Sequence, residues 1–179
     1  TSSLLRRTKA WCDEVEPDLV CLTGDFVEND ADIEALLDEL WPLRARYGCF
    51  AVFGNHDFSR KLDPPEPPAY QMRALLADML GRPWYRNART DPQANDVDHI
   101  ARAMCERGVH VLRNANVRLN VPGGPFYVAG VDDPQQRRHD AGLALRGVPP
   151  GAPLVLLAHS HDVLPSLQGA SRPLLILSG

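Results

Sequence analysis

The sequence predicts an α/β fold in a single domain, and two observations carry this prediction. A strand, a helix and a second strand follow one another over residues 18–53, which is the order of a βαβ unit with parallel strands. Apolar runs with the character of buried strands return at residues 153–159 and 173–179. The length of 179 residues is sufficient for one domain with a sizeable core.

Helices and strands alternate in the first half of the chain. Apolar side chains at helical spacing predict a helix over residues 3–16, which ends where a proline disfavours the α conformation of the residue before it. The first strand follows over residues 18–25. Asp30 is the expected N-cap of the next helix, whose apolar face extends from Ile33 to Leu43. Pro42 falls late in this helix and is expected to kink or shorten it.

The chain changes character after residue 57. Residues 59–96 contain a proline-rich stretch and many polar residues, and they are predicted to form an insertion. This insertion is either a surface excursion or a lid over a site, since long loops in compact domains are often functional. A helix is expected from Val97 to Arg107. Beyond it, closely spaced strands over residues 109–112, 117–121 and 126–131 predict an antiparallel meander. A short helix is expected over residues 141–145.

Composition argues against several classes of protein. The net charge of −4 gives no basic face, so nucleic-acid binding is not expected. The cysteines lie far apart without a C-x-x-C pair, which predicts free thiols in a reducing compartment; they are Cys12, Cys21, Cys49 and Cys105. No run reaches the roughly 18 apolar residues that a membrane-spanning helix needs.

Three apolar runs end in residues that can bind a metal or transfer a proton. The first ends in Gly24-Asp25, the run Cys49–Phe53 leads into Gly54-Asn55-His56-Asp57, and the run 153–159 ends in His159. Gly54 is expected to adopt backbone angles closed to other residues and to let the chain approach a ligand closely. Asn-His-Asp after a strand can also be an ordinary turn with self-bonded side chains. Because such residues recur at strand ends, the sequence predicts one metal centre assembled across a sheet.

These residues resemble the motifs of the calcineurin-like metallophosphoesterases. The ordered motifs of that family are D-x-H, G-D-x-x, G-N-H-[DE], a lone histidine after a strand, and G-H-x-H. The middle three match Gly24-Asp25, Gly54–Asp57 and His159 in the right order. The segments 17–25 and 156–162 look most like the bacterial membrane-associated phosphohydrolase branch. The resemblance implies an α/β/β/α sandwich of mixed sheets flanked by helices, over residues 1–179 as an incomplete single domain.

The resemblance also implies a role for each matched residue. Two divalent metal ions (Mn, Fe, Zn or Mg) would be the cofactors, with Asp25 as the bridging ligand and Asn55 and His159 as further ligands of the second metal. His56 would bind the phosphate and protonate the leaving oxygen, work that suits an imidazole. Asp57 would orient the turn or a neighbouring imidazole.

Two motifs of the family are absent from residues 1–179. D-x-H is expected upstream of Thr1, and G-H-x-H is expected to begin where the chain ends at Gly179. Both supply ligands to the first metal. The sequence is therefore interpreted as a fragment of a complete enzyme or as a degenerate member that lost a metal, and residues 1–179 alone are expected to be inactive.

The sequence leaves two functions open. The first is a metal-dependent hydrolase of a phosphodiester, phosphomonoester or pyrophosphate bond, acting on a small phosphorylated substrate such as a lipid head group, in the cytoplasm or peripheral to the inner membrane. The second is a non-catalytic scaffold for protein interaction. No substrate-binding residue is assigned: Arg137-Arg138-His139 is either a solvated loop or a phosphate contact, and His161 is either a rim residue or simply exposed.

Overall fold

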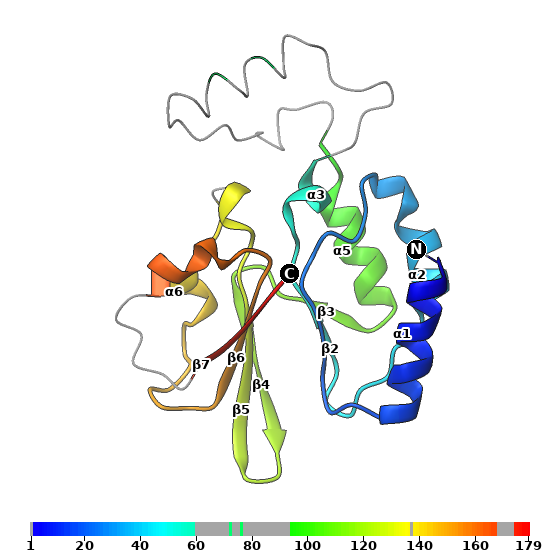
Figure 1. The fold of residues 1–179 in the computed structure, drawn as a ribbon. Coiled ribbons are helices and arrows are strands. Elements are labelled where there is room, and N and C mark those ends of the chain that lie inside the picture. The colour runs from blue at the N-terminus through cyan, green and yellow to red at the C-terminus, as the bar shows by residue number, and fades with distance from the viewer. Residues whose placement is uncertain (1, 60–71, 73–75, 77–93, 137, 168–173) are drawn as a thin grey trace.

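A computed structural model describes residues 2–59, 72, 76, 94–136, 138–167 and 174–179 (Figure 1). Most of the insertion predicted at 59–96 lies outside the described residues. The alternatives of a surface excursion and a lid therefore stay predictions.

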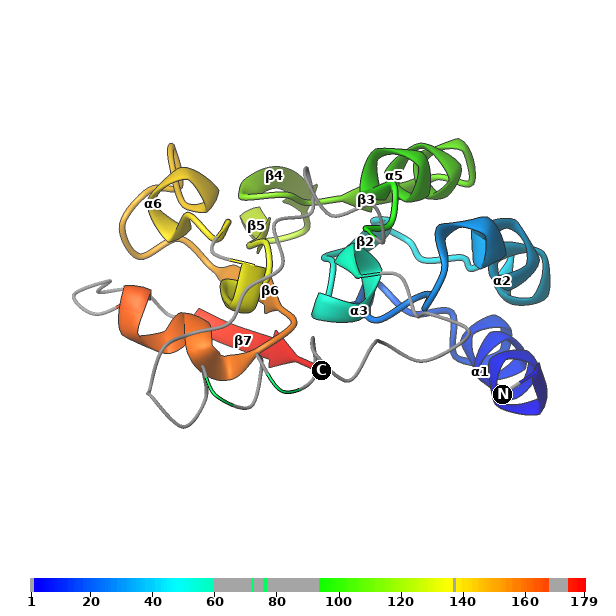
Figure 2. The same ribbon diagram turned by 90° about the horizontal axis from the view of Figure 1, so that it is seen from above.

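The first sheet is parallel and has the strand order β1-β2-β3. Its outer face is covered by helices that are seen together in Figures 1 and 2. The strands are β1 (Val20–Leu22), β2 (Cys49–Ala51) and β3 (Val109–Val111), and the helices are α1 (Ser2–Val15), α2 (Ile33–Leu40) and α5 (Val97–Glu106). The parallel pairing of β1 with β2 across α2 confirms the predicted βαβ unit.

The second sheet is mixed and has the order β4-β5-β6-β7. Strands β4 and β5 pair antiparallel, whereas β5 with β6 and β6 with β7 pair parallel. The strands are β4 (Ala115–Val121), β5 (Gly124–Gly130), β6 (Leu154–Ala158) and β7 (Leu174–Ser178). Helix α6 (Ala141–Ala144) and the 3₁₀ turn His161–Leu167 lie on its outer side (Figure 2).

The predicted three-stranded meander is wrong in its first strand. Residues 109–111 pair parallel with β2, in register Cys49↔Val109, and only 115–130 form a hairpin. The chain passes from the first sheet to the second at Asn114, which has a positive φ of 50°. Close spacing in sequence could not show this change of sheet, because pairing depends on which apolar faces meet.

The two sheets face each other and bury a common core, which gives the predicted α/β/β/α order of layers (Figure 2). Only the second sheet is mixed. Six buried apolar side chains make the contact between the sheets: Phe50, Val52, Leu112, Val128, Val155 and Leu157. The sheets lie close together at Gly130, where an added Cβ would be 2.5 Å from the Cβ of Leu112 and 2.6 Å from Val52.

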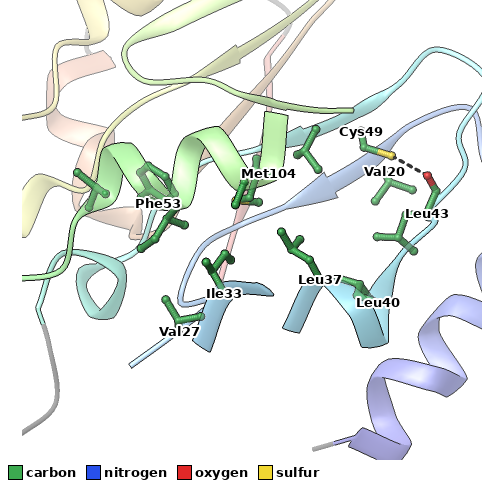
Figure 3. Packing of buried hydrophobic residues seen from close by; sticks show 14 of the residues in the cluster. Val20, Val27, Ile33, Leu37, Leu40, Leu43, Cys49, Phe53 and Met104 are labelled. Carbon is green, nitrogen blue, oxygen red and sulfur yellow. Dashed lines mark hydrogen bonds between the residues drawn. The ribbon is translucent and has the colours of Figure 1, made fainter. Parts of the chain in front are cut away.

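A second apolar cluster holds the helices onto the first sheet (Figure 3). Ile33 and Leu37 of α2 are almost fully buried there, as are Met104 and Ile100 of α5. Helix α2 ends at Leu40, earlier than its apolar face suggested, because a proline follows at position 42. None of the helices in the described part of the chain is long and apolar enough to cross a membrane.

Two smaller expectations need correction or refinement. Asp30 does not cap α2; it begins a 3₁₀ turn (Asp30–Asp32), and its carboxylate accepts a hydrogen bond from the backbone N–H of Asp96. All four cysteines are free thiols, as predicted; Cys12 and Cys49 are buried, Cys21 is partly buried, and Cys105 is exposed. Cys49 Sγ contacts the Leu43 carbonyl oxygen at 3.6 Å (Figure 3).

Candidate metal and phosphate site

The residues singled out at strand ends come together where the carboxyl ends of β1, β2 and β6 meet. Asp25 follows β1, Asn55 and His56 begin α3 (Asn55–Phe58) just after β2, and His159 follows β6. His159 Nε2 lies 3.4 Å from Asp25 Oδ2, and the backbone N–H of His56 donates to Asp25 Oδ1 over 3.1 Å. The prediction of a centre built across one sheet is wrong, because β1 and β2 belong to one sheet and β6 to the other.

Two glycines allow this close approach. Gly24 has a φ of +99°, and an added Cβ there would lie 2.4 Å from the backbone nitrogen of Gly54. The expectation that Gly54 adopts backbone angles closed to other residues is wrong, because its φ of −98° and ψ of 179° are open to any residue. Its lack of a side chain is what matters: a Cβ would lie 2.3 Å from Asp25 Oδ1 and 2.7 Å from the His159 ring.

Asp57 is fully buried and binds the two turns that carry the site. Its Oδ1 accepts from the N–H groups of Phe26 and Val27, and its Oδ2 accepts from those of Asp25 and Gly54. These bonds hold Asp25 in a left-handed conformation with a φ of 59°, which is uncommon outside glycine. Burial raises the pKa of Asp57 to about 6, although the four N–H groups each act to lower it. Asp57 therefore ties the turn of Asp25 to that of Gly54, and its charge also acts to raise the pKa of His56.

A backbone carbonyl orients His159. Its Nδ1 lies 2.7 Å from the carbonyl oxygen of Thr23, which can only accept, so Nδ1 donates to it and the ring is turned with Nε2 toward Asp25. An imidazole held in this way is the usual form of a metal ligand. His161, by contrast, is exposed, and its nearest charged neighbour is Asp162 at 3.9 Å.

His56 has a carboxylate partner that sequence reasoning missed. His56 Nδ1 lies 3.1 Å from Glu28 Oε1 at the half-exposed rim of the site. The hydrogen bond to Glu28 is the largest cause that raises the pKa of His56, with Asp25 adding to it and burial opposing it. Glu28 stands three residues after Asp25, and nothing in the local sequence distinguishes it from a solvated glutamate.

A second missed residue is Asp133, which follows the end of β5 in the sequence Asp132-Asp133-Pro134. It is fully buried, and neither carboxylate oxygen has a hydrogen-bond partner in the described structure. Its position after an apolar strand is the signal that could have found it, because Asp25 and His159 were found that way.

The residues at the site fit a divalent cation. A carboxylate oxygen, an imidazole nitrogen and, at the first residue of α3, an amide oxygen are donors that such ions accept. The Asp25 carboxylate and the His159 ring lie where a side chain at Gly54 would be, so the glycine lets these two donors come together. Within the described residues, no three His, Cys, Asp or Glu side chains gather closely enough to hold an ion by themselves.

Part of the basic cluster at 137–139 lies beside α3. The Arg138 guanidinium stands 5.5 Å from the ring centre of Phe58, which is the last residue of α3. Arg137 lies outside the described residues. Arg138 is thus near the site but is stacked on an aromatic ring, and its contact with a phosphate stays a prediction.

Comparison with known proteins identifies the family of this chain. The family model of calcineurin-like phosphoesterases matches residues 2–163. The chain belongs to this family. The family supports metal-dependent hydrolysis of phosphoesters and confirms both the resemblance and the sandwich fold.

Curated relatives are distant but extend over most of the chain. An uncharacterized metallophosphoesterase, YkoQ of Bacillus subtilis (strain 168), is 28% identical over 148 residues, covering 81% of this chain and 42% of that protein. A transmembrane protein with metallophosphoesterase domain from Danio rerio is 24% identical, covering 99% of this chain and 36% of that protein. The UDP-2,3-diacylglucosamine pyrophosphatase LpxG of Chlamydia muridarum (strain MoPn / Nigg) is 23% identical, covering 90% of this chain and 53% of that protein. The chain thus spans about half or less of these relatives' lengths.

Proposed function

We propose that this chain carries the catalytic core of a metal-dependent hydrolase that cleaves a phosphodiester, phosphomonoester or pyrophosphate bond. The observation that carries the proposal is the convergence of Asp25, His159 and His56 from three strand ends. The hydrogen bonds of Asp57 to four backbone N–H groups support it, because they hold Asp25 in an uncommon conformation. Strained backbone held by surrounding structure is a frequent property of functional sites.

Asp25, Asn55 and His159 would hold a divalent cation. In a dinuclear centre, Asp25 would be a ligand that the two ions share. Bound metal would polarise the phosphoryl group and supply a hydroxide near neutral pH. The Thr23 carbonyl holds the His159 ring with Nε2 on the ligand side, and the His56 backbone N–H donates to Asp25 Oδ1. These contacts support a ligand set that is oriented before the ion arrives.

His56 is proposed as the general acid. Its Nδ1 is engaged by Glu28, which leaves Nε2 as the nitrogen that faces substrate. Because Glu28 raises the pKa of His56, more of the imidazole is protonated at neutral pH. A proton at Nε2 can then pass to the leaving oxygen as the phosphorus–oxygen bond breaks.

The substrate class is inferred from a relative and from the charge near the site. LpxG is, by its name, a pyrophosphatase of a diacylglucosamine nucleotide, which favours a lipid head group among small phosphorylated substrates. Arg138, beside α3, is a candidate for contact with such a phosphate. Two relatives are named as transmembrane proteins, which favours a place at a membrane. The non-catalytic scaffold is the weaker alternative, because it does not require the Glu28–His56 pair.

The whole gene product, incubated with Mn²⁺ and an aryl phosphodiester such as bis(p-nitrophenyl) phosphate, tests the proposal. We expect turnover that chelation with EDTA abolishes and that added Mn²⁺ restores. Protein that binds no metal and leaves aryl phosphodiester, phosphomonoester and pyrophosphate substrates intact would favour the scaffold.

A further inference from the structure

Asp133 is a buried carboxylate whose charge no residue described so far compensates. It is 0% exposed, and both carboxylate oxygens lack a hydrogen-bond partner. The backbone N–H of Gln135 lies near enough to favour the charged form, but it is outside hydrogen-bonding geometry with either oxygen. A buried carboxylate without a partner is costly, and such groups in native proteins are normally paired or directed at a metal.

The neighbouring Asp132 is also a buried carboxylate, but it has a cationic partner. Asp132 is 3% exposed, and its oxygens lie 3.4 Å from Nε of Arg113. Its backbone N–H also donates to the side chain of Asn114. Arg113 thus turns toward Asp132, and Asp133 points elsewhere.

Charged groups of the candidate site act on Asp133. His159 favours its charged form, whereas Asp25 and Asp162 oppose it, and burial is the largest influence on its pKa, which is raised. Asp133 follows β5, which pairs parallel with β6 up to Gly130↔Leu157, and the Val131 N–H donates to the Leu157 carbonyl oxygen. Asp133 and His159 both lie just beyond these paired strand ends, so Asp133 is near the pair Asp25–His159. A cation between these groups would compensate both carboxylates at once.

We propose that Asp133 is a further cation-positioning residue of this site. Its oxygens accept hydrogen bonds from water bound to the divalent cation that Asp25 and His159 hold. We propose contact through water and not direct ligation, because no three His, Cys, Asp or Glu side chains in the described residues gather closely enough to hold an ion. The inference rests on the proposed function and deepens it, because it adds to the site a buried carboxylate that none of the motifs contains.

Calorimetric titration of the metal-free whole gene product with Mn²⁺ tests the inference, together with thermal unfolding of the metal-free protein. The test variant is Asp133→Asn and the matched control is Asp132→Asn, the adjacent buried carboxylate with a cationic partner. Loss of an outer partner typically weakens metal binding by roughly 10–100-fold, and we expect this of Asp133→Asn. Without metal the same variant should unfold at a temperature higher by roughly 2–4 °C, because an uncompensated buried charge is gone.

The control should behave in the opposite way. Asp132→Asn is expected to bind Mn²⁺ as wild type does and to unfold at a lower temperature, because Arg113 loses its carboxylate. If Asp133→Asn binds Mn²⁺ as tightly as wild type, the inference fails while the proposed function stands. If metal-free Asp133→Asn unfolds at a lower temperature than wild type, Asp133 is structural and the inference also fails. Wild-type protein that binds no Mn²⁺ would overturn both.

Discussion

Replacing Gly54 with alanine separates a steric role in the site from a conformational one. The backbone at Gly54 has a φ of −98° and a ψ of 179°, so alanine can adopt it without strain. The added Cβ, however, would lie 2.3 Å from Asp25 Oδ1 and 2.7 Å from His159 Cε1. Since non-bonded carbon atoms approach no closer than about 3.5 Å at optimal packing, these side chains must move by about 1 Å.

The magnitude follows from that displacement. Extra atoms in a packed site cost about 1–3 kcal/mol of stability, so Gly54→Ala should still fold at 25 °C. A misplacement of about 1 Å at the reacting groups can lower the rate by about 10²-fold. We therefore expect kcat/KM for an aryl phosphodiester to fall by about 10²-fold, with Mn²⁺ affinity reduced as well.

Gly130→Ala is the matched control. Its Cβ would overlap Leu112 and Val52 in the core between the sheets, a similar overlap away from the site. Thermal unfolding should show a loss of stability for both variants, whereas activity per folded molecule should fall only for Gly54→Ala. Equal activity of Gly54→Ala and wild type would refute the steric role.

Three further predictions concern the roles of single residues and of the chain. In the whole gene product, His56→Ala should lower kcat by about 10²–10⁴-fold and leave metal content unchanged, whereas Asp25→Ala should remove metal and activity together; equal metal loss by elemental analysis would make His56 a ligand. Glu28→Gln should lower the pKa of His56, because the hydrogen bond to Glu28 raises it. Since activity requires the protonated imidazole, the fall of kcat at alkaline pH should begin at a lower pH than in wild type. An unchanged pH profile of kcat would show that Glu28 does not act on His56. Residues 1–179 alone should not hydrolyse an aryl phosphodiester with Mn²⁺, because the family's D-x-H and G-H-x-H ligands are absent from them; measurable metal-dependent turnover would contradict this.

The sequence by itself was sufficient for most elements and for the chemical types at the site. Apolar periodicity, with glycines and prolines at the breaks, predicted the βαβ unit, the hairpin and the strands before His159 and Gly179, because these signals are local. It also placed Asp25, Asn55, His56 and His159 at the ends of strands. In parallel strands of packed sheets, such ends meet at one side of the fold.

Only the tertiary structure decided which strands share a sheet and which side chains support the site. His159 meets Thr23, 136 residues away in the chain, and Asp57 binds backbone groups more than 30 residues before it. Glu28 has no local sequence signal that separates it from a solvated glutamate, and the complete burial of Asp133 is not visible from its place after an apolar strand. Their roles arise because burial and neighbouring charge, which set the behaviour of a carboxylate, are properties of the folded surroundings and not of the residues beside it in the chain.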